Sequence, residues 1–220
     1  MSPMKAIFIH MTAGAADLLP LKAVNALLNA DMLIGEAVLT EVLKEFVPHN
    51  CIIAEDLREA TGFFSFSGMK SSVQLVRISP GDAISTEGLL KEVEFFEMAG
   101  YETEIIPGVS RIQAQAAMRR FPLTRRGLSH SFWVADIKEM HSPSRLFRDT
   151  ALAAASTATL VLRNTGMYKE RLLEIIGQVR KGEDALTIME DDLIIMTRKE
   201  QNGTQSLSAT QNIPESYGTI

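Results

Sequence analysis

Residues 73–127 have the sequence VQLVRISPGDAISTEGLLKEVEFFEMAGYETEIIPGVSRIQAQAAMRRFPLTRRG, which contains two successive transitions from strand through loop to helix. The first begins at 73–78, a short, apolar and β-branched run that predicts a strand ending at the Pro-Gly turn of 79–82. Leu89, Val93 and Phe96 then recur at helical spacing. Gly100 follows where a left-handed residue commonly ends a helix.

The second transition starts with a strand predicted at 101–106, which Pro107 and Gly108 end. Ser110 and Gln113 have the spacing of a capping box that opens the next helix. A glycine-containing turn before a helix N-terminus exposes backbone N–H groups, which favour anionic or carboxylate-bearing ligands. Open α/β sheets bind ligands beyond the carboxyl ends of their strands, so we expect the ligand site here.

The flanking sequence alternates strand and helix patterns in the same way, which predicts an α/β fold with a parallel sheet. We expect two α/β domains, at 1–117 and 118–220, that meet near residues 115–128. Before the central stretch the predicted strands are 5–10, 32–34 and 51–54. Two helices are predicted between these strands. The first has an apolar face formed by Leu21, Val24, Leu27 and Leu28, and the second covers 37–46. After it the predicted strands are 129–135, 157–163 and 185–189, and the predicted helices are 144–155 and 168–181, the latter closed by Gly182.

The C-terminal part carries a hairpin signal, because Asn202-Gly203 separates two apolar runs at 193–199 and 204–209. The tail from residue 213 shows no periodicity and is predicted to be disordered. The segment 56–70, which is rich in Phe and Gly, is interpreted either as a lid or as a loop packed by its own aromatic rings.

The composition and charge of the chain argue against several classes of function. The 220 residues carry a net charge of −5, which does not favour long-range attraction to nucleic acid or to an anionic membrane. Cys51 is the single cysteine, so an intrachain disulfide and a paired-cysteine metal site are excluded. The scattered histidines give no metal-ligand spacing, and no apolar run approaches the roughly 20 residues of a spanning helix. We expect a cytoplasmic globular protein without a metal.

Several motifs in order resemble one family. RxxPGD at 77–82, a helix ending in AG, EIIPGVS at 104–110 and PLTRRG at 122–127 resemble the uroporphyrinogen-III C-methyltransferase group of the tetrapyrrole (porphyrin/corrin) methylases. The segments 5–34 and 157–164 support the resemblance. It implies two α/β domains with S-adenosylmethionine (SAM) in the cleft between them, a homodimer, and a tetrapyrrole acceptor in sirohaem or cobalamin synthesis.

The resemblance also implies residues that bind the cofactor. In the first loop, where the family carries GxGPGD, Gly14 is the glycine retained. Asp82 could accept hydrogen bonds from the amine or ribose of SAM, although capping its own turn is the alternative. The backbone amide of Ser110 is expected to matter more than its hydroxyl. The aligned cofactor positions are Gly14, Gly81, Asp82, Ala83, Ser110 and Thr124.

Two residue sets are candidates for handling the substrate. Glu36 stands where the family commonly has an Asp near the acceptor and could orient a pyrrole or accept a proton, although a solvated carboxylate is the favoured interpretation. A basic cluster has guanidinium groups suited to the carboxylates of a uroporphyrinogen. For Arg119 and Arg120, the favourable position of positive charge at a helix C-terminus is an equally good explanation. Contact with RNA phosphates is a less favoured alternative than contact with substrate carboxylates. The cluster comprises Arg119, Arg120, Arg125 and Arg126.

Some positions depart from the family pattern and keep other functions open. Gly88 and Lys91 stand where the family has an Arg and a Glu, whereas Glu92 is retained. Asn164 stands where a cofactor-contacting Met is usual. One alternative is a catalytically silent relative that binds SAM or a partner. Another is a methylase for a different acceptor, such as RNA or peptide.

Overall fold

A computed structural model describes residues 4–12, 15–57, 73–81, 87–138, 142–181, 184–189 and 192–198. The chain forms two compact units, and the change from the first to the second falls between Ala114 and Gln115. None of the described helices is long and apolar enough to cross a membrane.

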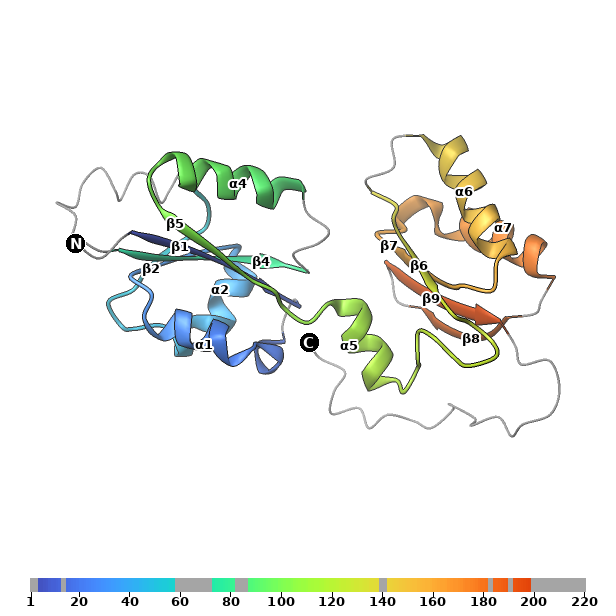
Figure 1. Cartoon of the computed structure of the whole chain (residues 1–220), viewed down its shortest axis with the longest axis horizontal. Coiled ribbons are helices and arrows are strands. Elements are labelled where there is room, and N and C mark those ends of the chain that lie inside the picture. Colours follow the sequence, from blue (N-terminus) through green and yellow to red (C-terminus); the bar gives the residue numbers. More distant parts are fainter. Residues whose placement is uncertain are drawn as a thin grey trace. The chain divides into compact units, whose positions relative to one another are not determined.

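The first unit is built on a five-stranded parallel sheet with the order β3-β2-β4-β1-β5. Helices α1 and α2 cover one face and α4 covers the other (Figure 1). Its strands are β1 (Lys5–Met11), β2 (Met32–Ile34), β3 (Ile52–Ala54), β4 (Gln74–Pro80) and β5 (Glu102–Ile106). Its helices are α1 (Leu21–Leu28), α2 (Ala37–Leu43) and α4 (Glu87–Met98), with 3₁₀ turns at Ala16–Leu18 and Lys44–Phe46.

The middle of strand β1, residues 6–9, is apolar because both of its faces are covered. Ile7 and Ile9 pack in the cluster with α1 and α2, whereas Ala6 and Phe8 pack in the cluster with α4. Such a continuous apolar run is typical of a parallel strand between two helical layers. The strand therefore contributes to the core on both faces of the sheet.

The predicted apolar face of α1 is wrong in part. Leu21 is 82% exposed and Leu28 is 53% exposed, while Ala23, Ala26 and Leu27 are buried. The buried stripe of α1 is thus formed by these three residues, and the leucines at the two ends of the helix lie outside it. Spacing alone does not separate these two faces, since alanine and leucine are both apolar.

The ends of two central elements follow the sequence closely. Gly100 has φ +86°, and the N–H of Tyr101 donates to the carbonyl of Phe96, so the predicted end of α4 is confirmed. Strand β4 continues two residues beyond its predicted end, through Pro80, which pairs with Met11. Proline is tolerated there because it is the last residue of the strand.

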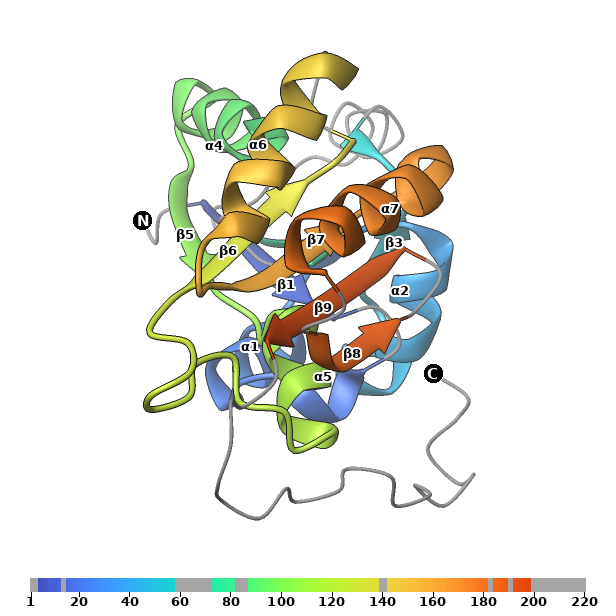
Figure 2. The same cartoon turned by 90° about the vertical axis from the view of Figure 1, so that its right-hand side faces the viewer.

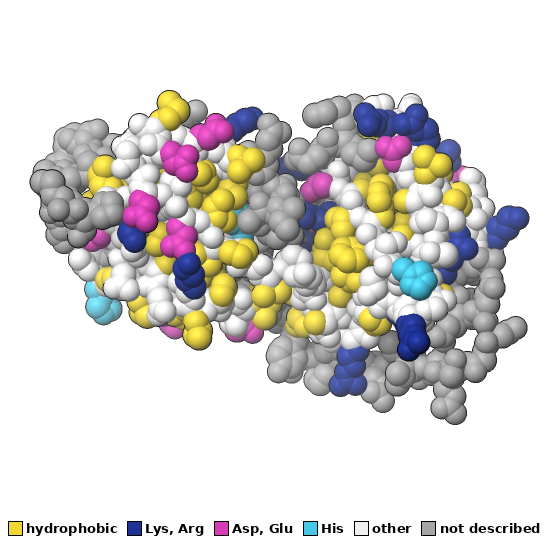
Figure 3. Space-filling view, viewed as in Figure 1, with side chains coloured by type: hydrophobic (Ala, Val, Ile, Leu, Met, Phe, Trp, Pro, Cys, Tyr) yellow, Lys and Arg dark blue, Asp and Glu magenta, His cyan; other side chains and the backbone are white. Residues whose placement is uncertain are grey.

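The edge strand β5 carries charges that form ion pairs with neighbouring elements. Glu102 pairs with Lys5, and Glu104 pairs with Lys22. Figure 3 shows acidic and basic side chains next to each other on the first unit. Charged side chains on an edge strand oppose pairing with another chain.

The second unit contains a four-stranded sheet with the order β6-β7-β9-β8. Helices α6 and α7 lie side by side on one of its faces (Figure 2). The strands are β6 (Phe132–Asp136), β7 (Thr159–Arg163), β8 (Asp184–Met189) and β9 (Leu193–Arg198). The helices are α5 (Arg111–Met118), which begins in the first unit, α6 (Pro143–Ala155) and α7 (Lys169–Arg180), preceded by a 3₁₀ turn at Gly166–Tyr168.

Strand β9 makes this sheet mixed rather than parallel. It lies between β7 and β8 and is antiparallel to both. Both of its sides are thus occupied, so β9 does not form the hairpin predicted with 204–209. That second hairpin segment and the tail from 213 lie outside the described residues.

The end of α7 also differs from the prediction. Lys181 adopts the left-handed conformation, with φ +50°, and its N–H donates to the carbonyl of Gly177. A lysine therefore takes the position assigned to Gly182, which lies outside the described residues. Strand β6 begins three residues later than predicted, because Ser129 belongs to a separate bridge with Arg125.

Candidate functional site

The carboxyl edge of the first sheet contains a topological switch point. From β1 the chain passes through α1 to β2 on one side, and from β4 it passes through α4 to β5 on the other. Strands β1 and β4 are neighbours, and the chain leaves their carboxyl ends toward opposite faces of the sheet, to α1 and α4 respectively. Open α/β sheets bind ligands at this point.

Three loops are joined at this edge. The hydroxyl of Thr12 donates to the carbonyl of Val109 at 2.7 Å, which links the ends of β1 and β5. The N–H of Gly81 donates to the carbonyl of Met11 at 2.9 Å, which links β4 to β1. Gly81 has φ +92°, a conformation that favours glycine.

The candidate residues of the first unit lie near strand ends where they are described. Ser110 is buried, and its hydroxyl accepts a hydrogen bond from the Gln113 N–H at 3.2 Å, as the capping motif predicts. Glu36 is exposed at the N-cap of α2, two residues after the end of β2. Gly14, Asp82, Ala83 and most of the segment 56–70 lie outside the described residues.

The retained acid Glu92 is already engaged. Its carboxylate forms a two-point ion pair with Arg77, with Nε–Oε2 at 2.9 Å and Nη2–Oε1 at 3.3 Å. Arg77 also donates to the carbonyl of Ile78 at 2.8 Å, at the end of β4. Glu92 thus orients a side chain of the central sheet. Gly88 is the second residue of α4, and a Cβ added there would meet no atom within 4 Å.

The predicted basic cluster lies on a short turn and a helix end in the second unit. Arg119, Arg120 and Arg126 are exposed, and Arg125 is half-buried. Arg125 and Ser129 exchange two backbone hydrogen bonds of 2.8 and 2.9 Å. Thr124, directly before this turn, is exposed.

A chain of buried hydroxyls anchors this turn to the second sheet. The hydroxyl of Ser129 accepts from the Thr159 N–H at 3.0 Å and donates to the carbonyl of Ser131 at 2.7 Å. Thr159 also lies 3.3 Å from the hydroxyl of Thr197. All three hydroxyl-bearing residues are buried, so the turn has a fixed attachment point.

We expect Ser129→Ala to lower the free energy of unfolding by about 2 kcal/mol. The change removes the hydrogen bonds of the Ser129 hydroxyl with the N–H and hydroxyl of Thr159 and with the carbonyl of Ser131. Urea denaturation followed by circular dichroism measures the change. Ser131→Ala is the matched control, since Ser131 is exposed and contributes its carbonyl to the network. Equal stability of both variants would contradict an anchoring role for Ser129.

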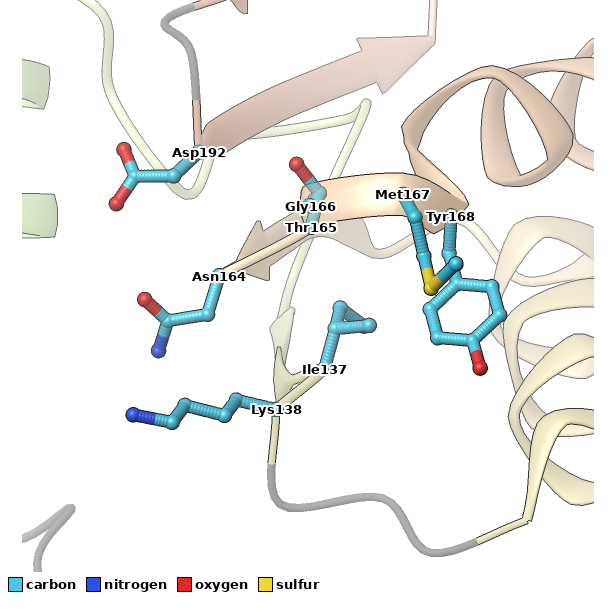
Figure 4. Close-up of a pocket in the computed structure, with 8 residues that line it drawn as sticks. All are labelled: Ile137, Lys138, Asn164, Thr165, Gly166, Met167, Tyr168 and Asp192. Carbon is cyan, nitrogen blue, oxygen red and sulfur yellow. The ribbon is translucent and has the colours of Figure 1, made fainter.

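A pocket of about 480 Å³ lies at the carboxyl ends of β6 and β7 in the second unit. Figure 4 shows its residues: in this view Lys138, Asn164 and Asp192 extend to one side, and Met167 and Tyr168 lie on the other. The pocket therefore combines an apolar wall with a polar rim, as small-molecule sites commonly do. The lining residues are Ile137, Lys138, Asn164, Thr165, Gly166, Met167, Tyr168 and Asp192.

A polar network stands at the rim of this pocket. Asp136 accepts hydrogen bonds from Nδ2 of Asn164 at 2.9 and 3.0 Å and forms an ion pair with Arg163 at 3.3 Å. Sequence reasoning noted Asn164 only as a departure from a family pattern and missed Asp136. Asp136 and Asn164 each directly follow a predicted strand, and this shared position was the signal that could have identified them.

In the described part of the chain, no group of three or more His, Cys, Asp or Glu side chains is placed to hold a metal ion. Cys51 is half-buried, and burial raises the pKa of its thiol to about 11. At neutral pH it is therefore protonated and a poor ligand or nucleophile.

Comparisons with known proteins agree with this architecture. The uroporphyrinogen-III C-methyltransferase of Cyanidium caldarium is 31% identical over 136 residues, which cover 58% of this chain and 54% of that enzyme. The chain thus spans about half the length of this relative. Uroporphyrin-III C-methyltransferase from Thermus thermophilus, complexed with S-adenosylhomocysteine, has a TM-score of 0.59 at 20% identity, covering 88% of this chain and 92% of its own.

A cobalt precorrin-4 methyltransferase of cobalamin biosynthesis has a TM-score of 0.65 at 20% identity, with 88% of this chain and 85% of that chain covered. At such identities the two solved structures show a common fold. The family description "Tetrapyrrole (Corrin/Porphyrin) Methylases" matches residues 7–202, which is most of the sequence. The chain therefore belongs to the tetrapyrrole (corrin/porphyrin) methylase family.

Proposed function

We propose that this protein is a SAM-dependent methyltransferase that acts on a tetrapyrrole, such as uroporphyrinogen-III or a precorrin. The family match over residues 7–202 carries the proposal. A homodimer, which the resemblance implies, is part of it. Both sheets also present loops at the carboxyl ends of parallel strands, where α/β proteins bind small molecules.

The described residues fit a ligand such as SAM. Its adenine ring has apolar faces, and Ile137, Met167 and Tyr168 supply an apolar wall in the second-unit pocket. In the first unit, the aligned cofactor positions are Gly14, Gly81, Asp82, Ala83 and Ser110, followed by Thr124 in the second. Of these, Gly81 and Ser110 lie at the strand ends around the switch point.

Methyl transfer demands little chemistry from the protein. SAM supplies a methyl group on a sulfonium sulfur, which an acceptor atom displaces in line. The protein must hold the acceptor in line and exclude water. Glu36, exposed two residues after the end of β2, is our candidate for orienting the acceptor or accepting its proton.

The basic cluster is the proposed contact for the substrate carboxylates. No acidic residue occurs from 105 to 135, so the segment is locally positive in an acidic protein. Arg119, Arg120 and Arg126 are exposed and Arg125 is half-buried, which leaves guanidinium groups accessible to carboxylates.

One observation favours the alternative of a catalytically silent relative. The retained Glu92 forms a two-point ion pair with Arg77, and Gly88 and Lys91 replace the family's Arg and Glu. A silent relative binds SAM or its product without transferring the methyl group. Binding and transfer must therefore be measured separately.

The test combines S-adenosylhomocysteine titration with transfer of a labelled methyl group from SAM to uroporphyrinogen-III. We expect micromolar binding and labelled product, with at least tenfold slower transfer in Arg125→Ala/Arg126→Ala, because two carboxylate contacts are lost. Arg145→Ala/Arg148→Ala is the matched control, since both arginines are exposed on α6.

The outcomes separate the candidates. Binding without transfer to uroporphyrinogen-III or a precorrin would favour the silent relative, and transfer to RNA or peptide alone would identify another acceptor. A folded, ligand-free protein that does not bind S-adenosylhomocysteine would contradict the proposed function. An equal loss of transfer in both double variants would remove the basic cluster from the substrate site.

A further inference from the structure

We propose that Thr12 is a positioning residue for the carboxyl edge of the first sheet. Its hydroxyl bonds to the loop after β5 and holds that loop in one conformation before a ligand binds, so that binding does not have to order it. The inference rests on the proposed function, because it specifies what prepares the same site for the cofactor.

The end of β1 contacts the loop after β5 at two successive points. At the first, the chain at Gly108 passes so close to β1 that an added Cβ would lie 1.8 Å from the carbonyl oxygen of His10. At the second, the hydroxyl of Thr12 donates to the carbonyl of Val109 at 2.7 Å. The first contact is close packing of two backbones, and the second is a hydrogen bond that opposes their separation. Together they define the position of this loop at the sheet edge.

The hydrogen bond to Val109 comes from a side chain, so it depends on the residue at position 12. By contrast, the loop after β4 is joined to β1 through backbone atoms, from the N–H of Gly81 to the carbonyl of Met11. When the pattern GxGPGD is aligned with Gly14 as its second glycine, its first glycine falls at Thr12, and glycine has no hydroxyl to donate. A single substitution can therefore remove this bond and leave the backbone contacts in place.

The backbone of Thr12 is itself held in place. Its carbonyl accepts a hydrogen bond from the N–H of Ala15 at 3.0 Å, and Ala15 is buried. Thr12 also directly follows Met11, the last residue of β1, which packs in the core with α1 and α2. The donor hydroxyl therefore belongs to a firmly packed part of the first unit.

The Thr12 bond fixes the peptide group between Val109 and Ser110. The described peptide bonds are trans, so the N–H of Ser110 points to the side opposite the Val109 carbonyl. Among the described residues this N–H has no acceptor. Ser110 also opens α5, since its hydroxyl accepts from the N–H of Gln113 and its carbonyl accepts from the N–H of Ala114. The orientation of one peptide group thus sets that of the first turn of α5 and of the donors exposed there.

The experiment measures the affinity for S-adenosylhomocysteine by calorimetry. Residues that become ordered on binding lose conformational entropy, and a bond already present in the free protein removes part of that cost. Thr12→Val keeps the shape of the side chain and removes the donor, so we expect about tenfold weaker binding with a less favourable entropy. Thr12→Ser keeps a hydroxyl donor, so we expect an affinity within about threefold of the wild type.

Thr103→Val is the matched control. Thr103 lies on β5, and its hydroxyl also makes a hydrogen bond of 2.7 Å, to Glu97. It is paired with Ala6 near the amino end of the strand, away from the carboxyl edge, so its removal should leave the affinity unchanged. All variants are titrated at a temperature at which circular dichroism shows them folded, so that a loss of stability does not alter the comparison.

Hydrogen exchange gives a second measurement of the same role. In the free protein, the amides of residues 108–114 should exchange faster in Thr12→Val than in the wild type, and S-adenosylhomocysteine should restore slow exchange. Thr103→Val should match the wild type in this segment. Faster exchange confined to the loop after β5 would identify loop ordering as the cause of the weaker binding.

The failures are distinguishable. If the wild-type protein does not bind S-adenosylhomocysteine, the proposed function fails and the role of Thr12 fails with it. If the wild type binds and Thr12→Val binds equally well, or if Thr12→Ser is as weak as Thr12→Val, the positioning role is overturned while cofactor binding stands. An equal loss of affinity in Thr103→Val would also overturn it, because the effect would then belong to the stability of the whole unit.

Discussion

Gly108→Ala is expected to destabilise the first unit by about 4 kcal/mol or more, or to prevent its folding, because the added methyl group has no space. A Cβ at this position would lie 1.8 Å from the carbonyl oxygen of His10 and 2.7 Å from its carbon. His10 belongs to β1, whose backbone pairs with β4 and β5, so it cannot move away without breaking the central sheet. The loop after β5 would have to leave the sheet edge instead.

A series of glycine substitutions tests this explanation. At Gly35 the Cβ would lie 2.2 Å from Cγ2 of Ile78 and 3.1 Å from its carbonyl oxygen, so the severe clash is with a side chain rather than with backbone, and Gly35→Ala should cost less than Gly108→Ala. Gly177 lies exposed in α7 with open space around it, and Gly177→Ala should stabilise the protein by roughly 0.5–1 kcal/mol. Urea denaturation of the three variants gives the order. A Gly108→Ala protein as stable as the wild type would refute the close approach of this loop to β1.

We expect Arg180→Met to lower the free energy of unfolding by about 3 kcal/mol, because a buried guanidinium donates to backbone carbonyls that methionine cannot satisfy. Arg180 is 1% exposed on α7 and donates to the carbonyls of Ala154 at 3.1 Å and Ala158 at 2.8 Å. These carbonyls lie at the end of α6 and just before β7. Arg180 therefore holds the α6–β7 connection against α7.

The controls distinguish this role from ordinary packing. Arg180→Lys retains the charge but not the forked donors, so we expect an intermediate loss of stability. Arg171→Ala removes an exposed arginine from the same helix and should change stability by less than about 0.5 kcal/mol. If Arg180→Met unfolds within 0.5 kcal/mol of the wild type, the two carbonyl contacts do not stabilise the second unit.

The candidate site was only partly accessible to sequence reasoning. The Ser110 cap and the loops at the switch point followed from turn residues next to strand patterns, which are local signals. The pocket in the second unit joins residues 137–138, 164–168 and 192, and its formation depends on which strands are neighbours. The pairing of Asp136 with Asn164 was invisible for the same reason, since 28 positions separate them.

The sequence by itself determined the alternation of strands and helices, the helix end at Gly100 and the family to which the chain belongs. These properties are carried by short-range periodicity, turn chemistry and ordered motifs. Only the tertiary structure decided that β9 lies between β7 and β8, that Ala23 rather than Leu21 faces the core, and that Asp136 orients Asn164. The physical reason is that strand order, register and burial depend on contacts between distant segments, and a local pattern is compatible with several such pairings.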